Sequence, residues 1–272
     1  MRRAVDSRDI PQDPPYQGHD VVYEHRTRIQ VFGAEHRQDA LALADLGVDH
    51  LGFCPAEDRI LAAQQASLSV EDAKALLSEL PEHVHSVLVF ASPDPDLVRE
   101  VAQSVRPDYV QICWEVDTIG PAREARLRAD LGGIKVIKEI GVSGPDSREA
   151  ALSAARRYEN AADILILDSQ GDAAYIGATG RTHDWSVSRA ISRTMRLPCI
   201  LAGGLGSDNV EAALQVVNPW GVDSFSRTNR PDGRKDLGET RAFVEAVRRF
   251  DEARRRRGLR RPSGSSMSAE SE

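Results

Sequence analysis

The sequence predicts a single (β/α)8 barrel with flexible extensions at both ends, and two observations carry this prediction. Short, apolar, β-rich runs alternate with longer segments whose apolar residues recur at helical spacing. Eight such units fit between residues 28 and 250, which is within the usual size of this barrel. Strands that are apolar on nearly every residue are typical of a parallel sheet covered by helices on both faces. A doubly wound open sheet built from the same strands is the alternative.

The expected strands are RIQVF (28–32), HLGFC (50–54), SVLVF (86–90), YVQIC (109–113), IKVIK (134–138), ILILD (164–168), CILAG (199–203) and VDSF (222–225). The segments between them carry helix start and stop signals. The helix over 38–47 has Asp39 in its first turn and stops at Gly47, and the helix over 69–81 has Ser69 as its N-cap and Pro81 as its stop. Similar signals recur in 207–217 and 236–250.

The two ends of the chain differ from its middle in composition. We expect a polar N-terminal extension over 1–27, the barrel over 28–250, and a disordered tail over 251–272 that is first basic and then rich in serine. Such segments cannot bury enough apolar surface to become ordered. The basic run is expected to be the solvated end of the last helix, and a docking segment for an acidic partner is the alternative.

Composition and charge exclude several classes of protein. The chain of 272 residues has a formal net charge of -7, so we expect no nucleic-acid partner and no anionic membrane surface. Its three cysteines, Cys54, Cys113 and Cys199, lack the paired spacing of a zinc site and fit a reducing cytosol. No apolar run approaches the roughly 20 residues that cross a bilayer, and residues 1–20 lack the apolar centre of a secretory signal. The expected location is the cytoplasm.

In such a barrel the chemistry lies at the C-terminal ends of the strands. Asp168 ends an apolar strand, where an ionised carboxylate is unfavourable unless it is hydrogen-bonded or used. It therefore either serves a ligand or caps its loop. Gly203 and Gly204 end the seventh strand, just before a helix expected to begin near 207–209. Their backbone N–H groups and the helix N-terminus favour a phosphate, although a tight turn also explains two glycines.

Four stretches of the sequence resemble the phosphoribosylanthranilate isomerase family of tryptophan biosynthesis. They are VFGAEHRQDALALADLGVDHLGF, PAEDR with SVEDA, ILILDSQGDAAYIGATGRTHDW, and LAGGLGSDNVEAALQVVNPWGVD with KDLGETRAFVEAV. The resemblance implies an Amadori rearrangement, in which a ribosylamine 5-phosphate is opened and isomerised to a 1-amino-ketose. It requires a general acid at the ring oxygen and a general base at the second carbon of the sugar.

The resemblance also implies roles for individual residues. Asp168 matches the general acid of the family, and Gly180 lies in the loop that would close over it. Arg59 in PAEDR matches the arginine that binds the carboxylate of anthranilate; a surface arginine is the alternative. The remaining substrate-binding candidates lie at the ends of the fourth, seventh and eighth strands: Gln111, Gly203, Gly204, Ser226 and Arg227.

The chain departs from the family pattern at three strand ends. Phe32 occupies the position of the cysteine that serves as the family's general base, and phenylalanine cannot accept a proton. Cys113 or Cys54 could ionise and replace that base, or each could be a buried inert thiol. Arg227 replaces a glycine of the phosphate site and would either clash with the phosphate or bind a phosphate or carboxylate. Phe32 and Trp114 are expected to make the pocket narrower or more apolar.

Two functions follow from this pattern. The first is an Amadori-type aldose–ketose isomerase that acts on a phosphorylated sugar or N-ribosyl amine with an altered substrate or base, with Asp168 and Cys113 as catalytic residues. The second is a barrel that has lost turnover and binds or senses a phosphorylated metabolite. Because the departures cluster while Asp168 and its loop remain, remodelling explains the pattern better than decay. We expect no metal and no cofactor, and a monomer or homodimer.

Overall fold

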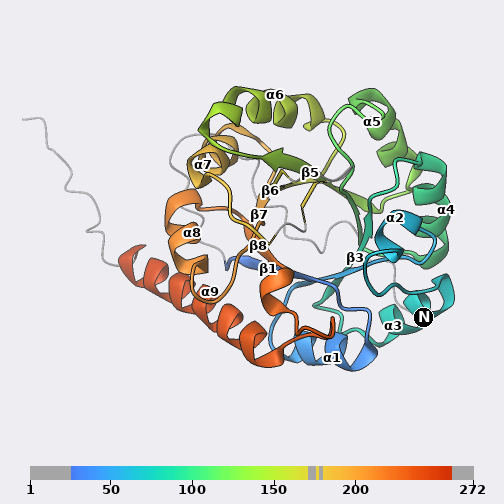
Figure 1. Cartoon of the computed structure of the whole chain (residues 1–272), viewed down its shortest axis with the longest axis horizontal. Coiled ribbons are helices and arrows are strands. Elements are labelled where there is room, and N and C mark those ends of the chain that lie inside the picture. The colour runs from blue at the N-terminus through green and yellow to red at the C-terminus, as the bar shows by residue number, and fades with distance from the viewer. Residues whose placement is uncertain (1–25, 171–175, 178–179, 259–272) are drawn as a thin grey trace, which may run out of the picture.

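The computed structural model describes residues 26–170, 176–177 and 180–258. Its strands are β1 (Arg28–Phe32), β2 (His50–Phe53), β3 (His85–Phe90), β4 (Tyr109–Ile112), β5 (Lys135–Val142), β6 (Ile164–Ser169), β7 (Cys199–Leu201) and β8 (Gly221–Ser224). All pair in parallel and form a closed barrel in sequence order (Figure 1). The ring closes where β8 pairs with β1, from Arg28 with Gly221 to Val31 with Ser224. The predicted barrel is confirmed, and the open sheet is excluded.

Helices surround the barrel and connect its strands (Figure 1). They are α1 (Arg37–Asp45), α2 (Arg59–Ala62), α3 (Val70–Glu79), α4 (Pro95–Val105), α5 (Pro121–Asp130), α6 (Arg148–Tyr158), α7 (Trp185–Thr194), α8 (Val210–Val217) and α9 (Leu237–Gly258), with short 3-10 turns η1 (Pro145–Ser147) and η2 (Ser226–Thr228). The Ser69 hydroxyl accepts a hydrogen bond from the Asp72 N–H, so the predicted N-cap is confirmed. Among the described helices, none combines the length and apolarity needed to span a bilayer.

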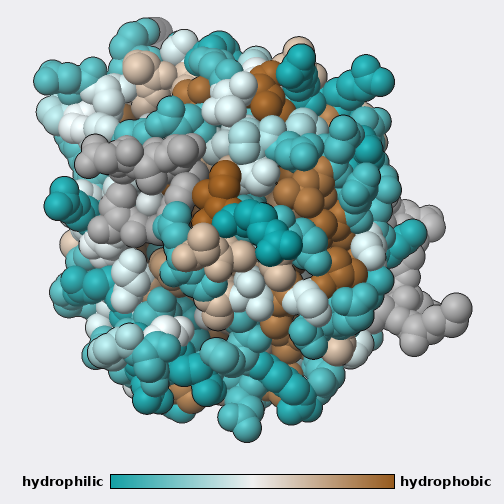
Figure 2. Space-filling model, turned by 45° about the vertical axis from the view of Figure 1, so that its right-hand side comes forward, coloured by the Kyte–Doolittle hydropathy of each residue, from teal (hydrophilic) through white to brown (hydrophobic). Residues whose placement is uncertain are grey.

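The outer surface is mainly polar. Figure 2 shows one face, on which hydrophilic residues surround smaller apolar areas. Among the described residues, the large apolar side chains that are exposed are Val216 and Leu237, at 38% and 39%. The helices have therefore turned their apolar stripes towards the sheet, as the helical spacing requires.

Alternation along each strand divides the core into two layers. On β6, Leu165 and Leu167 join the apolar cluster between sheet and helices, whereas Ile164 and Ile166 belong to a separate cluster inside the barrel. Successive side chains of a strand point to opposite faces of the sheet. Asp168, two residues after Ile166, therefore points into the barrel at its C-terminal mouth.

Strand β5 extends beyond its predicted end at Lys138. Its pairing with β6 continues from Ile137 opposite Ile164 to Val142 opposite Ser169. Gly141 in this extension leaves room for the Gln170 side chain, because a Cβ there would lie 1.9 Å from Gln170 Oε1. The consequence is functional, since the extension places Glu139 inside the barrel.

Helix α9 continues past residue 250, where the barrel was expected to end, so the predicted tail begins inside a helix. Asp251 is 2% exposed, and its carboxylate accepts hydrogen bonds from the Thr27 backbone N–H (3.0 Å) and the Thr27 hydroxyl (2.6 Å). These bonds fix the last helix to the chain just before β1. Residues 1–25 and 259–272 of the predicted extensions lie outside the described residues.

We expect Asp251→Ala to lower the free energy of unfolding by about 2 to 3 kcal/mol, because it leaves two buried donors of Thr27 without their charged acceptor. Urea unfolding measures the loss. Glu252→Ala, one residue further along, is the matched control, since Glu252 is exposed and pairs only within α9, with Arg256 at 3.7 Å. Equal stability of the two variants would show that α9 is not fixed in this way.

Candidate active site

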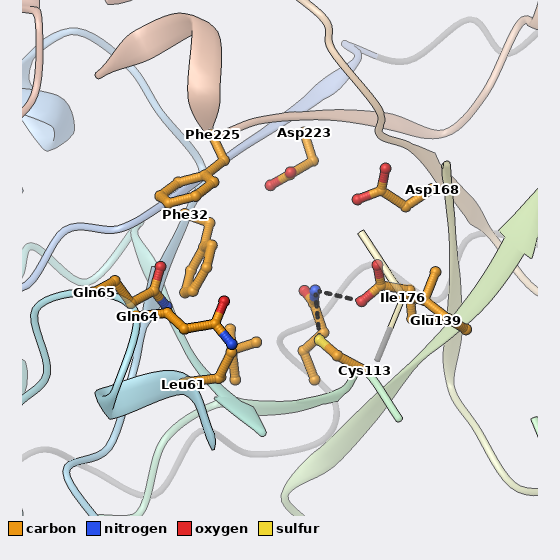
Figure 3. Close-up of a pocket in the computed structure, with 12 residues that line it drawn as sticks. Phe32, Leu61, Gln64, Gln65, Cys113, Glu139, Asp168, Ile176, Asp223 and Phe225 are labelled. Atoms are coloured by element: carbon orange, nitrogen blue, oxygen red, sulfur yellow. Dashed lines mark hydrogen bonds between the residues drawn. The ribbon is translucent and has the colours of Figure 1, made fainter. Parts of the chain in front are cut away.

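A cavity of about 260 Å³ lies at the C-terminal mouth of the barrel. Its lining residues come from strand ends and from the loops that follow them: Phe32, Leu61, Gln64, Gln65, Val89, Gln111, Cys113, Glu139, Asp168, Ile176, Asp223 and Phe225. Figure 3 shows three carboxyl groups directed into this space, from β5, β6 and β8. The cavity therefore combines an aromatic side with an acidic side.

Asp168 lies in this cavity at the end of β6, as its position after an apolar run predicted. Burial raises the pKa of the Asp168 carboxyl group to about 6, although the Ser169 N–H opposes the rise by donating a hydrogen bond to Oδ1 (2.6 Å). A carboxyl group of this pKa holds a proton in part of the molecules near neutral pH, which suits a general acid.

Glu139 stands beside Asp168. A Cβ at Gly177 would lie 2.5 Å from Glu139 Oε1 and 2.6 Å from Asp168 Oδ2, so both carboxyl groups face the same glycine, whose φ is +89°. Burial, followed by the charge of Asp168, raises the pKa of Glu139 well above its usual range. Two carboxyl groups this close oppose each other's ionisation. The strand predicted from the sequence ended at Lys138, four residues before the end of β5 at Val142, so Glu139 was missed. The alternation Lys135, Ile137, Glu139 was the available signal.

Asp223 is the third carboxyl group, and it too was missed as a site residue. Its Cα is opposite that of Gln30 in the β1–β8 register, so both side chains point inward. Burial and then the charge of Asp168 raise the pKa of Asp223 to about 7, while the Gln30 amide and the Lys235 charge lower it. In the sequence Asp223 lay within an expected strand, where nothing distinguished it from a residue that packs the barrel.

Gln111 and Cys113 from β4 both line the cavity, as predicted. Gln111 accepts a hydrogen bond from Gln30 Nε2 (2.8 Å) and donates one from its Nε2 to Glu139 Oε2 (3.4 Å). The environment of Cys113 does not suit a replacement base. Burial and the adjacent Glu139 raise the pKa of the Cys113 thiol well above its usual range, so the thiolate is strongly disfavoured. Cys54, the other candidate, is buried with its pKa raised to about 12, mainly by burial.

The candidates for phosphate binding meet in a small hollow next to the cavity. Gly180, Gly203, Gly204 and Ser226 line it together with Asp168. Gly203 and Gly204 have φ values of +87° and +60°, and a Cβ at Gly204 would lie 2.8 Å from the Gly180 carbonyl oxygen. The glycine pair is therefore required by a left-handed turn and by close packing of the loop, in addition to any role in binding a ligand.

The two predicted arginines do not line either space. Arg227 Nη2 contacts both carboxylate oxygens of Asp208, at 2.6 and 2.5 Å, so the carboxylate that it binds belongs to the protein. The predicted contact of Arg227 with a ligand stays a prediction. Arg59 is an exposed residue at the start of α2. Its neighbour Asp58 is fully buried and accepts hydrogen bonds from the N–H groups of Ala91 (2.7 Å) and Ser92.

Aromatic residues narrow the cavity on one side only. Phe32 and Phe225 pack with ring centroids 4.9 Å apart and form the aromatic side of the cavity (Figure 3). Trp114 was expected to contribute but lies outside the barrel wall, where its Nε1 donates to Glu124 Oε1 (2.7 Å). Because Cys113 points inward, the next residue in an extended backbone points outward.

The structure is a closed (β/α)8 barrel with carboxyl groups of raised pKa at its mouth, beside a glycine-lined hollow. This combination defines an enzyme that moves protons on a small molecule. The match to known proteins is more specific. The model of the family described as N-(5'phosphoribosyl)anthranilate (PRA) isomerase matches residues 29–246. The chain belongs to this family of aldose–ketose isomerases, and the predicted family and enzyme class are confirmed.

Individual relatives agree with the family match. N-(5'-phosphoribosyl)anthranilate isomerase of Methanocella arvoryzae is 35% identical over 82% of this chain and 98% of its own length. The enzyme of that name from Xanthomonas euvesicatoria is 34% identical over 84% and 96%. The crystal structure of phosphoribosyl anthranilate isomerase from Thermotoga maritima superposes with a TM-score of 0.65 at 28% identity, covering 82% of this chain and 98% of that one.

Proposed function

We propose that this chain catalyses an Amadori rearrangement, converting an N-(5-phosphoribosyl) amine to a 1-amino-1-deoxyketose 5-phosphate. The observation that carries the proposal is Asp168, a carboxyl group inside the mouth of the barrel whose burial raises its pKa to about 6. Related proteins bear the name N-(5'-phosphoribosyl)anthranilate isomerase, and one solved isomerase holds reduced 1-(o-carboxyphenylamino)-1-deoxyribulose 5-phosphate. The anthranilate derivative is accordingly the first substrate to test.

In this proposal Asp168 protonates the ring oxygen of the sugar, and Glu139 supports it. Glu139 is the adjacent buried carboxyl group, and burial together with the charge of Asp168 raises its pKa well above its usual range. The hollow beside Gly203 and Gly204 receives the phosphate. Residues 171–175 and 178–179 of the loop expected to close over the sugar lie outside the described residues. The family resemblance assigns Arg59 to the amine substituent, and Arg59 is not among the described residues that line the cavity. The main cavity has no arginine or lysine among its described lining residues, which favours a substituent with little negative charge.

The buried carboxyl groups favour an enzyme over a binding protein that has lost turnover. Burial of Glu139, Asp168 and Asp223 raises the pKa of each, so each destabilises the fold when it is ionised. A site that only binds a phosphorylated metabolite has no use for three acidic groups at the point of binding. Proton transfer to and from a sugar does require such groups.

Two measurements on the purified protein test the function. Loss of the fluorescence of N-(5'-phosphoribosyl)anthranilate measures turnover, and calorimetric titration with the reduced deoxyribulose 5-phosphate compound measures binding. We expect turnover together with tight binding. Tight binding without turnover would instead support the binding protein, and the absence of both would exclude this substrate class.

We expect Cys113→Ser to change kcat by less than about threefold, because a thiol with so high a pKa contributes almost no thiolate at neutral pH. The fluorescence assay gives kcat, and Cys199→Ser, at a buried cysteine between sheet and helices, is the matched control. A fall in kcat of two or more powers of ten for Cys113→Ser but not for Cys199→Ser would show that Cys113 is the base.

We also propose that the protein acts in the cytoplasm as a monomer or homodimer. The low cysteine content supports the location. The assembly is supported by a related isomerase from Thermotoga maritima, which is described as dimeric and of which generated monomers have been solved. Light scattering at several concentrations measures the mass, and a species larger than a dimer would contradict the proposal.

A further inference from the structure

We propose that Asp223 is the general base of this enzyme and removes the proton from the second carbon of the sugar. This inference rests on the proposed function and extends it to a residue for which the sequence indicated no role. The need for it is specific to this chain, because Phe32 at the end of β1 carries no atom that can accept a proton.

The position of Asp223 fits this role. Strand β8 lies beside β1, and Asp223 points into the barrel next to the Phe32 and Phe225 rings, whereas Glu139 and Cys113 approach the cavity from the other side (Figure 3). Asp168 and Asp223 stand on strands separated by β7. A sugar bound between them would present its ring oxygen to one carboxyl group and its second carbon to the other.

The two aspartates differ in their hydrogen bonds. Asp168 accepts a hydrogen bond from the Ser169 N–H (2.6 Å), which stabilises its anion. Asp223 Oδ1 is buried and has no hydrogen-bond partner within the described residues. Gln30 donates from Nε2 to Gln111 (2.8 Å), and its amide also hydrogen-bonds the Asp223 carboxyl group and lowers its pKa. A carboxylate with fewer donors is the stronger base, and apolar rings on one side strengthen it further.

The charges around Asp223 make a base that works near neutral pH. From β6, Asp168 raises the pKa of Asp223, and from β1 the Gln30 amide lowers it. Lys235, which donates to the Phe32 carbonyl oxygen and lies 5.3 Å from the centre of the Phe225 ring, also lowers this pKa. From β5, Glu139 is the remaining acidic neighbour, and its own pKa is raised in part by Asp223. The balance leaves the pKa of Asp223 at about 7.

The reaction balances with these two aspartates. Asp168 gives its proton to the ring oxygen as the bond between that oxygen and C1 breaks, leaving an iminium at C1. Asp223 then removes the proton from C2, and the C–H electron pair forms the C1=C2 bond while the nitrogen regains its lone pair. The resulting enolamine becomes the ketose when C1 receives the proton held by Asp223 and the C2 hydroxyl loses its proton, which restores Asp168.

Other groups at the cavity are less suited to this step. The Cys113 thiol has a pKa raised well above its usual range by burial and by Glu139. Glu139 adjoins Asp168 on the acid side of the cavity, and burial raises its pKa well above its usual range. Glu35, whose pKa burial raises to about 7, accepts a hydrogen bond from the Cys54 N–H (3.1 Å) and is not among the residues that line the cavity.

The test compares Asp223→Asn with the wild type and with Asp146→Asn, at an exposed residue of η1. An amide of the same shape cannot accept the proton, so kcat should fall by about two to four powers of ten. Affinity for the reduced deoxyribulose 5-phosphate compound should stay within about threefold. Wild-type kcat/KM should fall as the pH drops below about 7, because the base becomes protonated, and this limb should be absent in the residual activity of Asp223→Asn.

Rescue of activity in the Asp223 variants distinguishes loss of the base from damage to the folded structure. Formate added to Asp223→Ala should raise the rate at least about tenfold by supplying an external carboxylate, and Phe32→Cys should restore activity to Asp223→Asn. The assignment would be overturned if Asp223→Asn turned over within about threefold of the wild type. It would also be overturned if Glu139→Gln lost all activity and formate did not rescue Asp223→Ala. A wild-type protein that neither turns over nor binds the reduced compound would overturn the proposed function, and this assignment with it.

Discussion

Asp168→Asn is expected to lower kcat by about two to four powers of ten, because the amide cannot protonate the ring oxygen. The same variant should be more stable than the wild type at pH 8. The pKa of Asp168 in the folded state, about 6, is above its ordinary value of 3.8. Its favourable contribution to stability is therefore complete below pH 3.8 and is lost as the pH rises through 6. Removing the ionised group should add at most about 3 kcal/mol at pH 8.

The fluorescence assay gives kcat, and urea unfolding at pH 4 and pH 8 gives stability. The gain from Asp168→Asn should appear at pH 8 and largely disappear at pH 4. Asp45→Asn, at an exposed carboxyl group in α1, is the control and should change neither quantity. Unchanged kcat would exclude Asp168 as the acid, whereas a loss of stability at pH 8 would show that the carboxylate is held by donors that outweigh its burial.

Lys138→Met is expected to lower the free energy of unfolding by about 3 to 5 kcal/mol, because it leaves the buried Glu124 without its cation. Both side chains are fully buried, with Lys138 Nζ 3.3 Å from Glu124 Oε1, and Nζ also donates to the Trp114 carbonyl oxygen (2.9 Å). Burial raises the pKa of Glu124 and lowers that of Lys138. Without the lysine, the pKa of Glu124 rises further, so the loss should be greater at pH 8 than at pH 5.

Urea unfolding at the two pH values checks this result. The double variant Lys138→Met with Glu124→Leu replaces the pair by apolar side chains and should recover most of the lost stability. Arg249→Met is the matched control at an exposed ion pair, with Glu211 at 2.9 Å, and should cost less than about 1 kcal/mol. Equal losses for Lys138→Met and Arg249→Met would mean that the buried pair contributes no more than a surface one.

The fold and three candidate site residues follow from local patterns in the sequence. Strands that are apolar throughout, separated by amphipathic helices, have few ways to bury both faces, and the barrel satisfies all of them. Asp168 is recognisable because it interrupts an apolar run at its end. Gly203 and Gly204 are recognisable because few other residues adopt positive φ. These signals require no knowledge of which segments meet in space.

The other roles depend on groups that meet only in the tertiary structure. Whether Arg227 is available to a ligand depends on Asp208, and whether Cys113 ionises depends on Glu139 from another strand. The direction of a side chain matters as much as its position along the chain. Trp114 follows Cys113 by one residue, so its side chain points out of the barrel whereas that of Cys113 points in.

By itself the sequence determined the barrel, the family resemblance and the position of Asp168 at the end of β6, because periodicity and composition are local properties. Only the tertiary structure decided that Glu139 and Asp223 face the same cavity as Asp168. The physical reason is that the pKa of a buried carboxyl group depends on dehydration, donors and charges contributed by other strands. The spacing of residues along the chain does not encode the distances between groups on different strands.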